Sequence, residues 1–76
     1  MDISQGFGEV LVEFRKRAGT NQEALAHECG LDRTYISLLE RGRRQPSLKT
    51  LFAIAKALGV CPSELVACLE KKLVSG

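Results

Sequence analysis

Aromatic residues and proline are scarce in this 76-residue chain, which has no tryptophan, one tyrosine, three phenylalanines and two prolines. β-Branched residues are not enriched either, whereas Ala, Leu, Glu, Lys and Arg dominate the periodic stretches. These residue types favour helices over strands. We therefore predict an all-α fold made of one domain over residues 1–76. A core of this size is only marginally stable alone, so association with a second copy would help it.

The sequence shows neither a signal peptide pattern nor an apolar run long enough to span a membrane. Its three cysteines, Cys29, Cys61 and Cys68, are odd in number and have no Cys-x-x-Cys spacing. We interpret them as reduced thiols and expect a cytoplasmic protein that binds no membrane. His27 lies two residues from Cys29, a spacing that points side chains apart on a helix, so we expect no metal site.

Residues that could carry catalysis are also few. His27 is the single histidine and has no paired nucleophile near it in the sequence. The chain contains neither a glycine-rich phosphate loop nor a metal-ligand cluster. We expect a protein that is not an enzyme, uses no cofactor and takes no small-molecule ligand.

Positive charge is concentrated in one segment, although the net charge is only +2. Between Arg33 and Lys49 there are five basic residues and one acid, Glu40. A local basic patch on a nearly neutral protein is typical of a protein that binds a polyanion. A solvated charged face is the plainer alternative.

Apolar periodicity predicts the helices. The first should run from about residue 5 to 18, with residues 1–4 frayed, and Gly19 should end it. The second should end at Gly30, the third should span 33–41, the fourth should end at Gly59 and the fifth should span about 62–73. The first and fourth helices should bury apolar stripes consisting of Phe7, Val10, Leu11, Phe14 and Ala18, and of Leu48, Leu51, Phe52, Ile54, Ala55 and Leu58.

Capping residues stand before four of these helices. Asn21, Asp32 and Ser47 are expected N-caps, because their side-chain oxygens can accept hydrogen bonds from free backbone N–H groups. Cys61 occupies the fourth cap position, with Pro62 and Glu64 in the first turn behind it.

The segment from Gln22 to Leu39 predicts a helix-turn-helix. Ala26 is small enough for two helices to cross closely, Gly30 tolerates the positive φ of the turn, and Ile36 can fill the angle between the helices. Arg33, Thr34 and Ser37 should face outward from the second of these helices. Their hydrogen-bonding groups have the right length to touch base edges in a major groove, although solvated polar side chains would give the same pattern.

Residues 7–66 resemble the Cro/C1-type, or XRE-type, helix-turn-helix family of phage repressors and bacterial regulators. The stretches NQEALA, GLDRTYISLLERG, PSLKTLFAIAKALGV and PSEL carry the resemblance. The words DRTYIS and ERG-RRQPS also resemble the controller proteins of restriction–modification systems. Thr20 and Cys61 depart from the family, which usually has an aliphatic residue and a Ser or Thr there. The resemblance implies a compact, five-helix, lambda-repressor-like domain that binds double-stranded DNA and regulates transcription.

In such a family the helix at 33–41 is the recognition helix. Arg33 is the expected base reader, since guanidinium pairs with guanine O6 and N7, and Thr34 and Ser37 lie on the same face. Tyr35 is offset from them and either packs against the core or contacts a phosphate. The resemblance also implies a structural ion pair between Arg15 and Glu40. The expected phosphate contacts are Asn21, which could equally be only a cap, and Gln22, Tyr35, Arg41, Arg43 and Arg44.

The fifth helix has more apolar surface than a small core requires. Leu65 and Leu69 should face inward, which leaves other apolar side chains for a partner; the expected dimer interface is Val66, Cys68, Leu69 and Leu73. The resemblance implies a homodimer, since members of that family bind paired half-sites about one DNA turn apart; a monomer with an exposed apolar last helix is the alternative. RNA polymerase is a possible further partner. A restriction–modification controller and an antitoxin-type protein-binding module remain alternative functions.

Overall fold

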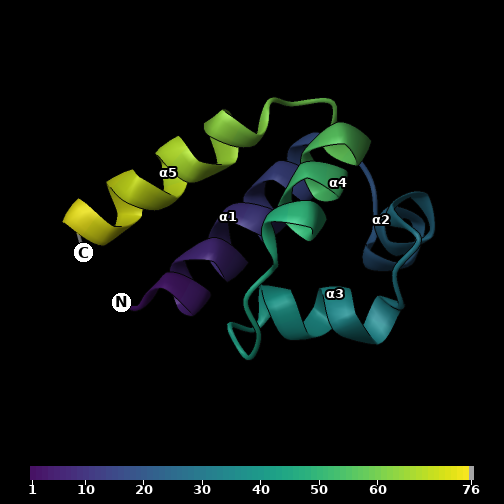
Figure 1. The fold of residues 1–76 in the computed structure, drawn as a ribbon, viewed down its shortest axis with the longest axis horizontal. Coiled ribbons are helices and arrows are strands. Elements are labelled where there is room, and N and C mark those ends of the chain that lie inside the picture. Colours follow the sequence, from purple (N-terminus) through teal and green to yellow (C-terminus); the bar gives the residue numbers. More distant parts are fainter. Residues whose placement is uncertain (76) are drawn as a thin grey trace.

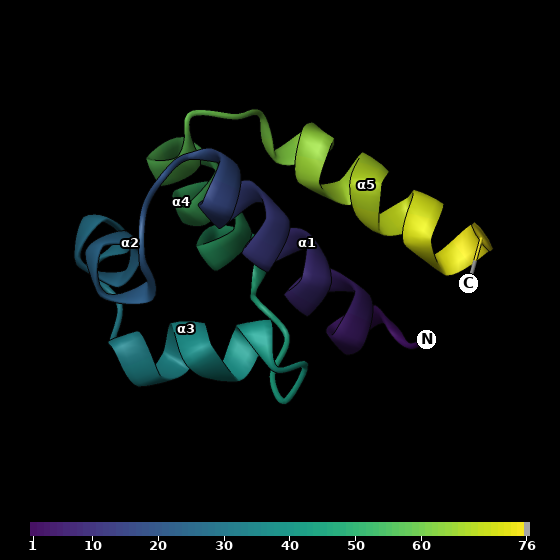
Figure 2. The same ribbon diagram turned by 180° about the vertical axis from the view of Figure 1, so that it is seen from behind.

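The computed structural model describes residues 1–75, and these form five α-helices without a strand. The all-α prediction is therefore confirmed. Helix α1 runs beside α5 in the opposite direction, so that both chain termini lie at one end of the molecule, while α2 and α3 form the other end (Figures 1 and 2). The helices are α1 (Ile3–Arg17), α2 (Gln22–Cys29), α3 (Arg33–Glu40), α4 (Leu48–Leu58) and α5 (Pro62–Ser75).

All five helices contribute to one buried core, and α1 lies at its centre with contacts to both α3 and α5. The predicted stripe on α1 is buried as far as Phe14, but Ala18 is exposed because it caps the helix end and no element covers it. The core residues are Phe7, Val10, Leu11, Phe14, Leu25, Ala26, Ile36, Leu39, Leu51, Ile54, Ala55, Leu58 and Leu65.

The apolar face of α4 is narrower than the sequence predicts. Leu51 and Ile54 are buried, but Leu48 is 75% exposed and Phe52 is 59% exposed. At about 100° per residue, Phe52 points well away from the direction of Leu51, and Leu48 lies in the first turn at the rim of the core. Assigning these two residues to the core was therefore wrong, and they remain as surface hydrophobic groups.

The start of α1 also differs from the prediction. The helix begins at Ile3, because Asp2 is an N-cap whose side chain accepts a hydrogen bond from Gln5 N at 2.8 Å, and the Gln5 side chain returns the interaction. This capping box holds the first turn, so residues 3 and 4 are helical rather than frayed. Gly6 and Gly8 lie inside the helix and are buried.

The other predicted helix ends are confirmed within a residue or two. Asn21, Asp32 and Ser47 accept hydrogen bonds from Ala24 N, Thr34 N and Thr50 N at 2.8, 2.7 and 3.1 Å. Helix α3 ends one residue earlier than predicted, with Arg41 as its C-cap, and α5 continues two residues further, to Ser75.

Candidate nucleic-acid interface

Helices α2 and α3 form the predicted helix-turn-helix. Gly30 adopts φ +68°, and the next residue, Leu31, donates its N–H to Ala26 O at 2.8 Å. Ala26 and Ile36 are both buried between the helices, with exposed fractions of 2% and 0%. A larger side chain at position 26 would separate the helices, because the core has no space there. This packing fixes the direction in which α3 presents its outer face.

The outer face of α3 carries the residues predicted to reach DNA bases. Arg33 and Thr34 are exposed, and Ser37 is half-buried beside them. Asp32 caps the helix immediately before this face. The backbone N–H of Thr34 donates a hydrogen bond to the Asp32 carboxylate. This hydrogen bond lowers the pKa of the Asp32 carboxyl group, and the positive charge of Arg33 adds a smaller contribution in the same direction. The cap is therefore a charged carboxylate at neutral pH, and it holds the first turn of α3 in place.

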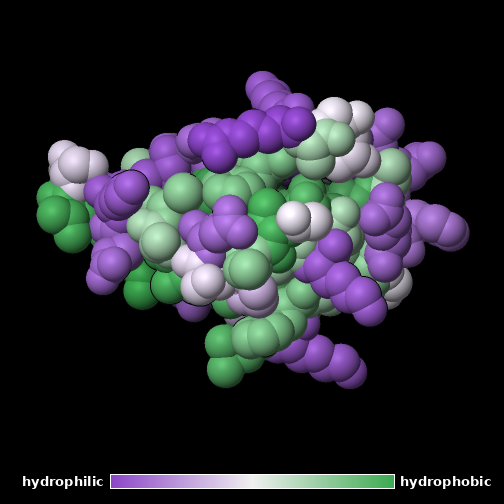
Figure 3. Space-filling model, turned by 90° about the horizontal axis from the view of Figure 1, so that it is seen from above, coloured by the Kyte–Doolittle hydropathy of each residue, from purple (hydrophilic) through white to green (hydrophobic). Residues whose placement is uncertain are grey.

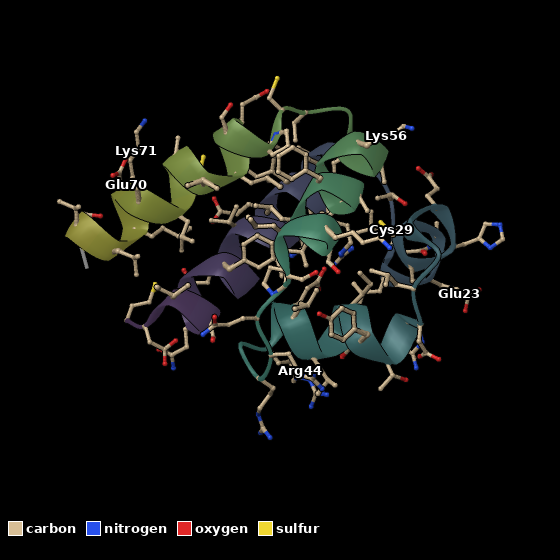
Figure 4. The ribbon with its side chains drawn as sticks, in the orientation of Figure 1. Glu23, Cys29, Arg44, Lys56, Glu70 and Lys71 are labelled. Carbon is tan, nitrogen blue, oxygen red and sulfur yellow. The ribbon has the colours of Figure 1, made fainter. Side chains whose placement is uncertain are left out.

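Three exposed arginines follow α3, as predicted: Arg41, Arg43 and Arg44. Arg44 extends from the loop below α3 (Figure 4), and its guanidinium lies 5.6 Å from the centre of the Tyr35 ring. The Tyr35 hydroxyl donates to Gln45 O at 3.4 Å, and its ring packs against the core. The structure thus shows Tyr35 packed against the core and beside the basic loop that carries Arg43 and Arg44, and its phosphate contact stays a prediction.

A polar hollow of about 410 Å³ lies where the N-terminus of α2 approaches the start of α3. Asn21 caps α2 there, and the free N–H groups of this helix end give it the electrostatics of an anion site. Arg33 lines the hollow from the α3 side. The structure thus brings a predicted phosphate-contacting end and the predicted base reader into one surface, lined by Arg15, Asn21, Gln22, Glu23 and Arg33.

Arg15 and Glu40 form the predicted ion pair beneath this surface. Arg15 Nε and Nη2 donate to the two Glu40 carboxylate oxygens at 2.5 and 3.2 Å, and Nη1 donates to Thr20 O at 3.0 Å. The two side chains are 14% and 5% exposed. The hydrogen bond to Glu40 raises the pKa of Arg15 further, so its guanidinium stays charged. The ion pair connects α1 to the end of α3 and thereby helps to set the angle of α3.

Gln22 also contacts this ion pair, and the sequence did not indicate that contact. Its Nε2 donates to Glu40 Oε1 at 2.8 Å, so the side chain is engaged inside the protein. No spacing rule relates residues 22 and 40, since their proximity arises only when α2 packs across α3. The predicted phosphate contact at Gln22 would have to come from its backbone N–H or from the edge of the amide left exposed.

The apolar surface of α5 is larger than predicted. Val66 is 47% exposed, whereas Cys68 and Leu69 are half-buried and pack against the core. Ile3 and Val74 add to this surface; they were missed because the sequence placed residue 3 in a frayed end and ended the helix at 73. Figure 3, which looks onto the side of the molecule along which α5 runs, shows hydrophobic groups at the surface between hydrophilic ones. A hollow of about 350 Å³ is lined by Ile3, Val66, Leu69, Glu70, Leu73 and Val74.

The side chains and helices of residues 1–75 also bear on metal binding and on membrane crossing. No three His, Cys, Asp or Glu side chains lie close enough together there to hold a metal ion. No single described helix has the length and apolar character needed to cross a membrane; α4 and α5 meet that test only as a pair bent by 106°.

Comparison with known proteins gives consistent matches. Residues 11–65 match the family described as helix-turn-helix. The control protein C.BamHI of Bacillus amyloliquefaciens is 48% identical over 61 residues, which cover 79% of this chain and 75% of that protein. An uncharacterised helix-turn-helix-type transcriptional regulator, y4dJ of Sinorhizobium fredii, is 41% identical over 66 residues, covering 87% of this chain and 86% of its own.

A solved structure has the same fold over nearly the whole chain. The clp gene regulator ClgR of Corynebacterium glutamicum superposes with a TM-score of 0.93 at 26% identity, covering 97% of this chain and 79% of its own. The match therefore extends from α1 to α5 and includes the helix that follows the helix-turn-helix.

Proposed function

The chain belongs to the helix-turn-helix family of Cro/C1-type transcriptional regulators, and from this premise we propose that it binds operator DNA sequence-specifically as a homodimer. In this proposal α3 enters the major groove. Arg33 reads a guanine, Thr34 and Ser37 contact neighbouring base edges, and the exposed arginines after α3 hold the flanking phosphates.

One observation carries the proposal: the outer face of α3 is polar and accessible, while its inner face is fully engaged in the core. Ile36 and Leu39 are 0% exposed, and Arg33 and Thr34 are exposed on the other side. The helix is also held rigidly, by the Asp32 cap at its start and by the Arg15–Glu40 pair at its end. A rigid helix with a free polar face is what groove recognition requires, because loosely held side chains lose discrimination between bases.

The apolar surface around Val66 supports the dimer. An exposed apolar patch of this kind on a small protein marks an interface, and burying it would stabilise a domain of marginal size. A two-fold axis through α5 would present two copies of α3 to two half-sites about one turn of DNA apart. The bound dimer would then regulate transcription by blocking RNA polymerase or by contacting it.

A restriction–modification controller is the more specific candidate within this class. The 48% identity to the control protein C.BamHI favours a controller function, whereas the 41% identity to the uncharacterised transcriptional regulator y4dJ, over more of the chain, does not distinguish the two. An operator found upstream of a restriction endonuclease gene would support the controller function. Operators confined to unrelated genes would exclude it. An antitoxin role would require a stable complex with a neighbouring gene product, which a size measurement of the mixture would reveal.

Selection of bound duplexes from a random pool tests the proposed function directly. We expect an enriched sequence composed of two inverted half-sites. Arg33→Ala should abolish preference for that sequence and keep the weaker binding to random DNA. A pool from which the protein enriches nothing would refute the proposal, and unchanged operator affinity in Arg33→Ala would remove Arg33 from its assigned role.

A further inference from the structure

Leu38 is an apolar residue on the recognition helix that the core does not use. It is half-buried, and within the described part of the chain it belongs neither to the buried core nor to the half-buried hydrophobic residues packed against that core. The buried residues of α3 are Ile36 and Leu39, on either side of it in the sequence. A leucine kept out of the core on this helix needs another explanation.

Helical geometry places Leu38 on the outer face of α3. At about 100° per residue, the direction midway between Ile36 and Leu39 points into the core, and Thr34 points almost opposite to it. Ser37 and Leu38 flank Thr34, at about 60° on one side and about 40° on the other. Leu38 therefore borders the same surface as Thr34 and Ser37, on the edge away from Arg33.

The backbone of Leu38 is fixed by the turn that follows the helix. Its carbonyl oxygen accepts a hydrogen bond from Arg43 N at 2.9 Å, which closes the end of α3 onto the basic loop. The side chain is thus attached to a rigid position between the outer face of α3, which carries Thr34 and Ser37, and the arginines proposed to contact phosphate. A group placed there would lie in the groove when those arginines engage the backbone.

The chemistry of leucine restricts what it can contact in a major groove. It has no hydrogen-bonding group, so it cannot pair with the donors and acceptors of a base edge, and leaving these groups unpaired would be costly. The C5-methyl group of thymine is the apolar feature that the groove offers. We propose that Leu38 packs against a thymine methyl in each half-site and makes that thymine part of the recognised sequence. The inference rests on the proposed function, since it requires α3 to bind operator DNA.

The test uses the operator obtained by random-pool selection. Each thymine of the half-site is replaced in turn by deoxyuridine, which removes only the methyl group, and the dissociation constants of the wild-type protein and of Leu38→Ala are measured. One replacement should weaken wild-type binding about fourfold, the value of one buried methyl group, and leave Leu38→Ala unaffected. Leu38→Met, which keeps an apolar side chain, should retain the sensitivity.

Thr34→Ala is the matched control, because the threonine methyl is the other apolar group on this face. It should lose the same factor as the wild type at the same deoxyuridine. The inference is overturned if no deoxyuridine weakens wild-type binding, or if Leu38→Ala remains as sensitive as the wild type; the regulator itself would then stand. If instead no sequence is enriched from the pool, the proposed function and this inference fail together.

Discussion

Gly8 of α1 approaches the end of α3 so closely that a β-carbon on it would lie 2.6 Å from the carbonyl oxygen of Glu40. The neighbouring carbonyl of Leu39 would be 2.7 Å away. Both atoms belong to the backbone and cannot rotate aside. Two turns further along α1, Arg15 holds the side chain of the same Glu40. The end of the recognition helix is therefore positioned by α1 through its main chain and through its side chain.

Gly8→Ala should destabilise the fold although alanine is the better helix former. The gain in helix propensity stabilises the variant by about 1 kcal/mol, and forcing the two backbones apart costs about 1–3 kcal/mol, so we expect a net loss of up to about 2 kcal/mol. Urea unfolding measures it. Gly6→Ala is the control, since its nearest neighbour is the flexible Cδ1 of Leu69 at 2.7 Å, which can move. Equal stabilities for both variants would contradict this account of Gly8.

Removing one partner of the partly buried ion pair between Arg15 and Glu40 should cost more stability than removing both. Glu40→Ala leaves Arg15 and the Gln22 amide without their acceptor, and we expect a loss of about 2–3 kcal/mol, below the full cost of breaking a buried pair because Arg15 keeps some exposure to water. The double variant Arg15→Met, Glu40→Leu should recover most of that loss in urea unfolding. If the double variant is as unstable as Glu40→Ala, the pair contributes net stability rather than orientation alone.

The sequence alone predicts the structure correctly wherever one residue determines a local feature. Side-chain oxygens at Asn21 and Asp32 define helix starts, and Gly30 defines a turn, because each acts within a few residues of itself. The interpretation failed where the outcome depends on distant packing. Only the position of α3 reveals why a glycine is needed at position 8. Phe52 was wrongly assigned to the core, since apolar character alone does not say how wide a buried face will be.

In the candidate site, too, some features can be predicted from the sequence and others depend on how the helices pack. The exposure of Arg33 follows from the period of its own helix, and the sequence predicts it. The link from Gln22 to Glu40 joins residues on two helices and is visible only once their crossing angle is known. The same holds for the α5 surface, where Ile3 contributes from the other end of the chain.

The basic loop should contribute affinity without sequence preference. Arg43→Ala combined with Arg44→Ala should weaken binding to operator and random DNA by the same factor. It should also reduce the slope of log K against log salt by about 1.8, which corresponds to about 0.9 for each lost phosphate contact. Lys56→Ala is the control, because Lys56 lies on α4 far from α3 (Figure 4). The salt dependence of DNA binding by this variant should have the same slope as that of the wild type. A changed sequence preference with an unchanged slope would make these arginines base readers.

Disruption of the α5 surface should separate the two copies. Val66→Glu introduces a charge into the apolar hollow shared with Ile3 and Leu73, and we expect a monomer in sedimentation velocity that binds single half-sites weakly. Ala67→Glu is the matched control, since Ala67 is exposed on α5 and does not line that hollow. A wild-type protein that sediments as a monomer at all concentrations, and on DNA as one copy, would refute the dimer.

Acid should weaken the start of the recognition helix through one identifiable group. The pKa of Asp32 is lowered in the folded protein, chiefly because its carboxylate accepts the Thr34 N–H, so its contribution to stability is present above the unfolded-state pKa of about 4 and is lost as the pH falls through the lower folded-state value. Asp32→Asn keeps a capping oxygen but cannot titrate. Between pH 6 and pH 2.5 the urea midpoint of the wild type should therefore fall more steeply than that of Asp32→Asn, because the unfolded wild-type chain binds the additional proton. Parallel profiles would mean that the carboxylate gains nothing from its charge at this helix end.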